Sequence, residues 1–237
     1  MHAADEQYSG RGKSESVSKE SITRMRKSGS YKDGCPVQPE QLRLLTIPHW
    51  NFEKKIQAGV MVVNAAVAEE VLDIFQELRQ AGYPIYKMQL IDDYAANDEA
   101  SMRDNNTSAF NCRPITGTTG TFSNHSYGTA IDINPIQNPY LKVKDPADAA
   151  ALWKGDSQLA HQLTSYCQRL PDRCQILPAE GARYLKRESQ AGVIVKGDAI
   201  YLAFSKRGWT WGGNWPSSRG TRVRTDYQHF EKVIAPR

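Results

Sequence analysis

The segment SNHSYGTAIDINP, residues 123–135, places His125 seven residues before Asp132, with Gly128 between them. Two interpretations compete: half of a metal site, or an ordinary turn that leads into an ordinary strand. On one continuous strand, this separation puts the two side chains on opposite faces. They converge only if the chain turns between them, and Gly128 offers the conformational freedom for that turn.

A second acid–histidine pair lies near the end of the chain, in DYQHFE, where Asp226 precedes His229 by three residues. On a straight strand these side chains also face apart, so a turn or twist is required. A hydrolytic zinc ion commonly takes three His or carboxylate ligands and leaves a fourth position for water. His125, Asp132 and His229 supply such a set, and Asp226 is then left as an acid–base residue. Spacing alone favours a structural role, because Asp and His are common in turns.

The composition indicates a globular chain. Its 237 residues are 40% hydrophobic and 24% charged, which permits one large domain or a domain plus an arm. No stretch approaches the roughly 20 apolar residues that span a bilayer, so we expect no integral membrane segment. A net charge of +4 is no nucleic-acid signature. Lys and Arg outnumber acids in residues 201–237, which favours an anionic substrate or polymer or, alternatively, a solvated surface.

Residues 1–38 are rich in Ser, Gly and Lys and show no hydrophobic period, so we expect a flexible N-terminal arm. Residues 39–237 read as the folded domain. Apolar residues at helical spacing predict a helix after Asn64 that stops at Gly82, with a strand before it and another at 83–92.

Three further segments complete this expectation. TAIDI, 129–133, is a strand candidate on which Asp132 shares a face with Ala130. DAIYLAFSKRG, 198–208, is a helix capped by Asp198, with Gly208 after its end. Residues 145–200 look helical and charged, with breaks at prolines and a glycine.

Four cysteines permit two disulfides in three connectivities. Cys167 and Cys174 bracket a short polar loop, which makes their pairing the most plausible. A bond between Cys35 and Cys112 is also possible and would pin the arm beside the next residue, Arg113. The alternative is four buried free thiols.

Several blocks together resemble the M15-type zinc peptidases of peptidoglycan. These blocks are AFNCR, SNHSYGTAIDINP, WGGNW and DYQHFE, in that order. The family pattern S-x-H-x-x-G-x-A-x-D, with a later acidic residue, two residues and a histidine, is filled at every position. Its positions here are Ser123, His125, Gly128, Ala130, Asp132, Asp226 and His229.

The resemblance implies a role for each residue. His125, Asp132 and His229 would bind Zn²⁺, and Asp226 would be the general base and later the acid for the leaving amine. Arg113 would stabilise the oxyanion or hold a substrate carbonyl or carboxylate. The implied fold is α+β, with a small antiparallel sheet packed against helices and the zinc cleft on one sheet face, as in hedgehog and DD-peptidase domains.

Three other residues are candidates for substrate contact: Ser108, Tyr127 and Trp211. Each also has a structural interpretation, as a turn residue, a packing residue and a core or cleft wall. Compared with compact phage enzymes of the family, residues 141–200 look like an insertion that shapes the cleft, covers it or docks a partner.

The expected function is hydrolysis of an amide bond in the peptide stem of bacterial peptidoglycan, with an L-Ala–D-Glu type L,D-endopeptidase as first choice. A D-Ala-D-Ala carboxypeptidase is the alternative within the enzyme class. A non-catalytic cell-wall-binding module that assists an envelope protein machine is the alternative outside it. Because this substrate lies outside the cytoplasmic membrane, we expect a periplasmic or secreted protein whose signal peptide is absent from the sequence given, with oxidised cysteines.

Overall fold

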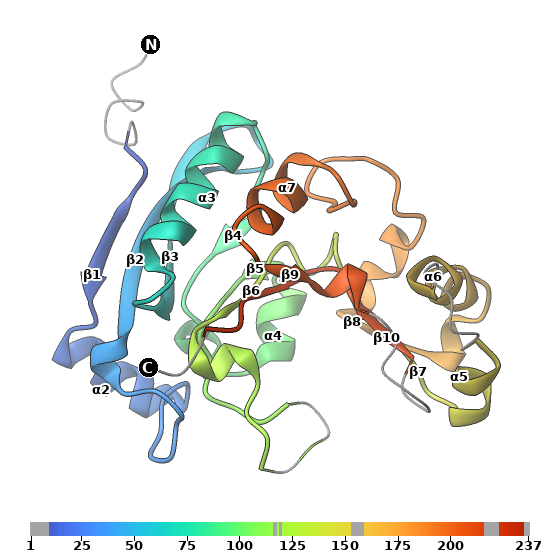
Figure 1. The fold of residues 1–237 in the computed structure, drawn as a ribbon, viewed down its shortest axis with the longest axis horizontal. Helices are drawn as coiled ribbons and strands as arrows, with labels where there is room; N and C mark the ends of the chain where they lie inside the picture. The colour runs from blue at the N-terminus through green and yellow to red at the C-terminus, as the bar shows by residue number, and fades with distance from the viewer. Residues whose placement is uncertain (1–9, 116–117, 119, 153–158, 216–222, 235–237) are drawn as a thin grey trace.

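The computed structural model describes residues 10–115, 118, 120–152, 159–215 and 223–234. These form a mixed α+β fold, as predicted, in which three-stranded antiparallel sheets pack with helices (Figure 1). The described part contains three such sheets rather than one, together with a two-stranded parallel pair. Within the described residues, no helix is both long and apolar enough to cross a bilayer.

The sheets divide the elements into groups. The first antiparallel sheet is β1 (Lys13–Ser16), β2 (Leu42–Trp50) and β3 (Ile56–Asn64). The second sheet is β10 (Arg224–Asp226), β7 (Tyr140–Val143) and β8 (Cys174–Leu177). The third sheet is β6 (Ala130–Asp132), β11 (His229–Glu231) and β9 (Thr210–Trp211). The parallel pair is β4 (Lys87–Met88) and β5 (Asn106–Thr107).

The helices are distributed along the whole chain. The α-helices are α2 (Lys19–Ser28), α3 (Ala68–Gln80), α4 (Asp98–Arg103), α5 (Pro146–Leu152), α6 (Leu159–Arg169) and α7 (Ala199–Ser205). Short 3-10 helices lie between them, at Pro39–Gln41, Ile91–Tyr94, Asn124–Tyr127, Pro171–Arg173, Ala179–Tyr184 and Gly212–Asn214.

The expectation of a flexible N-terminal arm needs correction within the described residues, because β1 pairs with β2 and α2 follows it. Ser18 caps α2 through the Ser21 N–H, and Gly29 ends the helix in the left-handed conformation. The segment shows no hydrophobic period because only Met25 of α2 is buried. Residues 1–9 of the predicted arm lie outside the described residues.

Two other expectations differ in extent. The helix predicted after Asn64 begins only at Ala68. The Asn64 Oδ1 accepts from the Ala66 N–H in a turn before the helix, and its amide donates to the carbonyl of Tyr127. The strand predicted at 83–92 is reduced to the two residues of β4. The segment at 145–200 contains α5 and α6, as expected, and also β8, which the sequence did not indicate. The Asp198 cap of α7 is confirmed.

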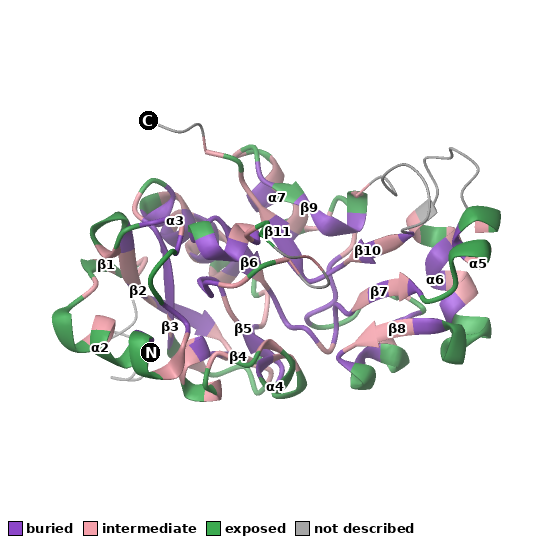
Figure 2. Cartoon of the chain, turned by 90° about the horizontal axis from the view of Figure 1, so that it is seen from below, coloured by how far each residue is buried: buried purple, intermediate pink, exposed green. Residues whose placement is uncertain are grey.

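A column of aromatic rings joins α3 and α7 to the sheet that carries His229. Phe75 of α3 meets Phe204 of α7 edge to face at 6.5 Å between ring centroids, and Phe204 stacks on Phe230 of β11 at 4.1 Å. All three side chains are at most 1% exposed. Figure 2 shows buried residues gathered in the interior, with exposed residues along α2 and α5 at the two ends. Strand β11 therefore rests on a rigid apolar support.

Candidate metal centre

The turn that carries His125 is built by residues on either side of it. Ser123 begins the short helix Asn124–Tyr127, and its Oγ accepts from the N–H of His125. Gly128 ends it with φ of 67°, and a Cβ there would lie 2.6 Å from the backbone nitrogen of Asn64. Only glycine fits this left-handed, tightly packed position. The predicted turn between His125 and Asp132 is thus present.

Asp132 and His229 meet because their strands are paired. In the antiparallel β6–β11 pair, Asp132 is directly opposite His229, and Ile131 is opposite Phe230. Successive strand residues point to opposite faces, so Ile131 and Phe230 enter the core while their neighbours turn toward the other face. Strand β10 ends at Asp226 and β11 begins at His229, which supplies the break in the strand that the spacing of DYQH required.

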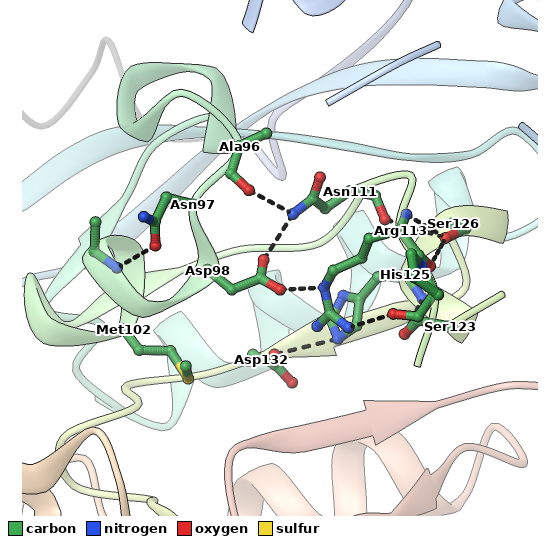
Figure 3. Close-up of polar contacts among 12 residues, drawn as sticks. Ala96, Asn97, Asp98, Met102, Asn111, Arg113, Ser123, His125, Ser126 and Asp132 are labelled. Carbon is green, nitrogen blue, oxygen red and sulfur yellow. Dashed lines mark hydrogen bonds and ion pairs between the residues drawn. The ribbon is translucent and has the colours of Figure 1, made fainter. Parts of the chain in front are cut away.

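Both imidazoles are held at the ring nitrogen that does not face Asp132. His125 Nε2 lies 3.2 Å from Asp132 Oδ2 (Figure 3). Its Nδ1 is 2.6 Å from the carbonyl oxygen of Ala109. His229 Nδ1 lies 2.9 Å from Asp132 Oδ1, and its Nε2 is 3.0 Å from Glu231 Oε2. One ligand atom from each of the three residues lies within 4.8 Å of the others. Such oriented nitrogen and oxygen donors fit a divalent cation, Zn²⁺ in particular.

The same arrangement shifts the pKa values of the group. Burial alone would raise the pKa of Asp132, but the adjacent imidazoles outweigh burial and hold that pKa well below its usual range. Burial opposes charge on His229, yet hydrogen bonds to Asp132 and Glu231 raise its pKa to about 10. A cation that binds the three residues near neutral pH must therefore displace a proton from His229.

Asp226 is the carboxylate that no ligand role uses. Its Oδ1 is buried without a hydrogen-bond partner among the described residues, although the residue as a whole is partly accessible from the cleft. Burial, reinforced by the negative charge of Asp132, raises the pKa of Asp226 above its usual range. A carboxyl group whose pKa is shifted toward neutrality is suited to proton transfer.

The WGGNW segment approaches Asp226 closely. A Cβ at Gly212 would lie 2.4 Å from the carbonyl oxygen of Asp226, and the Gly212 carbonyl accepts from the hydroxyl of Thr225 at 3.2 Å. At Gly213, a Cβ would lie 2.4 Å from the indole ring of Trp211. Both glycines are needed because backbone and side chains leave no room for a larger residue.

A cleft of about 440 Å³ opens over the three ligands and Asp226, and Arg113 lines it. The Arg113 guanidinium forms an ion pair with Asp98 of α4, and Asp98 also accepts from the Asn111 amide at 2.7 Å (Figure 3). The hydroxyl of Ser126, next to His125, accepts from the Arg113 N–H at 2.8 Å. The arginine is therefore fixed relative to the turn that carries His125.

Both disulfides expected from the sequence are present, Cys35–Cys112 and Cys167–Cys174. The first holds the residue that precedes Arg113, and the Cys112 N–H also donates to the carbonyl oxygen of Ser30 at 2.9 Å. The disulfide and this hydrogen bond thus attach the segment that carries Arg113 to residues 30–35 near the N-terminus.

The structure places the three predicted substrate-contact residues differently. Ser108 lines the cleft and pairs through its backbone with Asp132. Of the described residues that line the cleft, none is Tyr127 or Trp211. Trp211 is only 5% exposed, because it packs against Tyr227 and Phe230 in the core. The tryptophan that lines the cleft is Trp215, whose ring centroid is 5.1 Å from that of His229.

Sequence reasoning missed several polar or aromatic residues at the site, among them Asp98, Trp215, Arg224 and Glu231. Glu231 had a usable signal, since it lies two residues after His229 and so shares its strand face. Asp98 carried none, because its partner Arg113 lies 15 residues later, beyond α4 and β5, in a polar stretch with little periodicity.

The convergence of His125, Asp132 and His229 in an open cleft is typical of the metal centres of metallopeptidases. Residues 116–232 match the model of the M15 peptidase family that is described as D-alanyl-D-alanine carboxypeptidase. This part of the chain belongs to that family as an M15-type peptidase domain with a candidate metal site, and the family implies a peptide substrate. Searches of curated proteins and of solved structures returned no match. Arg113 and Ser108 precede the matched region.

Proposed function

We propose that this protein is a zinc-dependent endopeptidase that hydrolyses an amide bond in the peptide stem of bacterial peptidoglycan, of the L-Ala–D-Glu type. The observation that carries the proposal is the convergence of His125, Asp132 and His229 beside Asp226, whose buried Oδ1 has no hydrogen-bond partner among the described residues. The family match supports peptidase chemistry. The segments DAIYLAFSKRGWTWGGNW and AFNCR favour the endopeptidase branch, because they look more like that branch of the family than the dipeptidase branch.

Each of the chain's own groups has a place in this chemistry. A zinc ion held by the three ligands would supply electrophilic polarisation and lower the pKa of water to about 7. Asp226 accepts the proton of the attacking water and returns it to the nitrogen of the leaving amine. Arg113, held by Asp98, stabilises the negative charge that develops on the carbonyl oxygen.

The proposed location is outside the cytoplasm, either periplasmic or secreted. Two disulfides among the described residues support it, because such bonds persist in oxidising compartments. We further propose that the peptidase domain covers residues 39–237, onto which β1 and α2 pack, with 141–200 as an insertion. A contact between this segment and an envelope protein is a secondary proposal.

Digestion of purified muropeptides, followed by mass analysis of the products, tests the function. We expect cleavage within the stem between L-Ala and D-Glu. Asp226→Ala should abolish hydrolysis and retain zinc, whereas the matched control Asp172→Ala, an exposed acid outside the cleft lining, should leave both unchanged.

Two results would favour other functions. Release of a single terminal D-Ala would replace the endopeptidase with a D-Ala-D-Ala carboxypeptidase, the activity named by the matching family model. Full biological activity of Asp226→Ala would favour a wall-binding module without turnover.

A further inference from the structure

The charged residues of the cleft are unequally partnered. They are Asp98, Asp132, Asp226, Glu231, Arg113 and Arg224. Arg113 already forms an ion pair with Asp98, and Glu231 forms one with His229. Among the residues that the structure describes, none forms an ion pair with Arg224. Arg224 is therefore a cation of the cleft that has no anionic partner among the described residues.

The guanidinium group of Arg224 lies over the aromatic ring of Trp215. Its guanidinium carbon lies 5.2 Å from the centroid of the Trp215 ring, which is within the range of a cation–π contact. A guanidinium supported on one face keeps its N–H edge available, and that edge matches a carboxylate with two parallel hydrogen bonds. Trp215 also contacts His229, so the support for Arg224 is continuous with the metal centre.

The position of Arg224 along β10 places its side chain near that of Asp226. Arg224 and Asp226 are two residues apart on one strand, so their side chains share a face. Their Cα atoms are separated by roughly 7 Å at the usual rise per strand residue. Both side chains line the cleft, and the longer Arg224 side chain can cover this separation, so the two groups can contact the same substrate residue.

We propose that Arg224, supported by Trp215, determines specificity by binding a free carboxylate on the substrate residue whose amine leaves. The inference rests on the proposed function, in which Asp226 protonates that amine and so lies beside the residue that carries it. Carboxylate is the anionic group that peptide stems carry, and Arg224 is the cleft cation left to pair with it. Arg113 retains its separate role at the carbonyl oxygen.

Two synthetic stem peptides test the proposal. They contain the same cleavable L-Ala–D-Glu bond and differ only in whether the D-Glu residue carries a free α-carboxylate or a carboxamide. We expect the wild-type zinc protein to cleave the carboxylate peptide with the higher kcat/KM. Arg224→Gln should lower kcat/KM for that peptide by roughly tenfold to a hundredfold, the effect of losing a charge-assisted hydrogen bond, and change the carboxamide peptide little. Arg224→Lys should retain part of the preference.

The matched control is Arg169→Gln, which removes the same charge from an exposed position at the end of α6, outside the cleft lining. It should leave both peptides unaffected. Equal cleavage of the two peptides by the wild type, or an equal loss on both in Arg224→Gln, would overturn the inference and leave the peptidase proposal standing. Cleavage of neither peptide by the wild type would overturn the proposed endopeptidase, and this inference with it.

Discussion

The two disulfides close loops of very different length, and their removal should show it. Cys35 and Cys112 are 77 residues apart in sequence, whereas Cys167 and Cys174 are 7 apart. All four side chains are buried, at 9% exposure or less, so replacing each pair by alanine removes similar packing. The two double variants are therefore matched controls for each other.

The expected difference follows from the entropy of the unfolded chain. A cross-link stabilises by restricting the unfolded state, and the restriction grows with the logarithm of loop length. For these loops the relation gives about 4.5 kcal/mol for Cys35–Cys112 and about 2.4 kcal/mol for Cys167–Cys174. The difference of about 2 kcal/mol corresponds to roughly a 30-fold change in the folding equilibrium constant.

Denaturant unfolding at 25 °C, with the free energy extrapolated to water, measures both costs. The Cys35→Ala/Cys112→Ala variant should also lose kcat/KM while it retains metal, because Arg113 follows Cys112 directly and the metal ligands do not. An equal or smaller cost for the long loop would refute the reasoning from chain entropy. Unchanged kcat/KM would refute the idea that this disulfide positions Arg113.

Three further predictions concern the metal centre. Zinc binding at pH 7 should release about one proton, because His229 is protonated below its pKa of about 10 in the metal-free protein. The affinity for zinc should therefore rise with pH. Calorimetry in buffers of different ionisation enthalpy measures both the proton release and the zinc affinity. Glu231→Gln should weaken zinc affinity by about 10-fold to 100-fold in competition with a chelator, since it fixes the His229 ring; unchanged affinity would exclude that role. Asp98→Asn should lower kcat/KM by roughly tenfold or more through a mobile Arg113 while metal content stays constant; loss of metal would show a wider structural effect.

The amino-acid pattern predicted elements wherever burial is periodic. Helix α3 has six buried residues at helical spacing, and α7 has a side-chain cap in Asp198, so both were visible in the sequence. Strand β1 has no buried residue and α2 has one, so neither leaves a hydrophobic signature. Their order depends on pairing with β2 and on the Cys35–Cys112 bond, which are tertiary features.

The site divides in the same way. The convergence of His125, Asp132 and His229 could be predicted from the sequence, because the family pattern already includes the Gly128 turn and the strand that follows. Trp215 and Trp211 were harder to distinguish, because both flank the same two glycines. Only the fold shows that one ring is buried against Phe230 and the other faces the cleft.

The division of the active site between two sheets has a consequence for how such an enzyme can diversify. His229 belongs to the sheet of β6, β11 and β9, but Asp226 lies on β10, which pairs with β7, and β7 pairs with β8. Apart from Tyr140, which lies opposite Asp226, the residues of β7 and β8 belong to 141–200. That segment therefore supplies most of the sheet in which Asp226 lies, and it is an integral part of the fold around the site. Substitutions in that segment can change the position of Asp226, and hence which bond is cleaved, while the metal ligands His125, Asp132 and His229 stay in place.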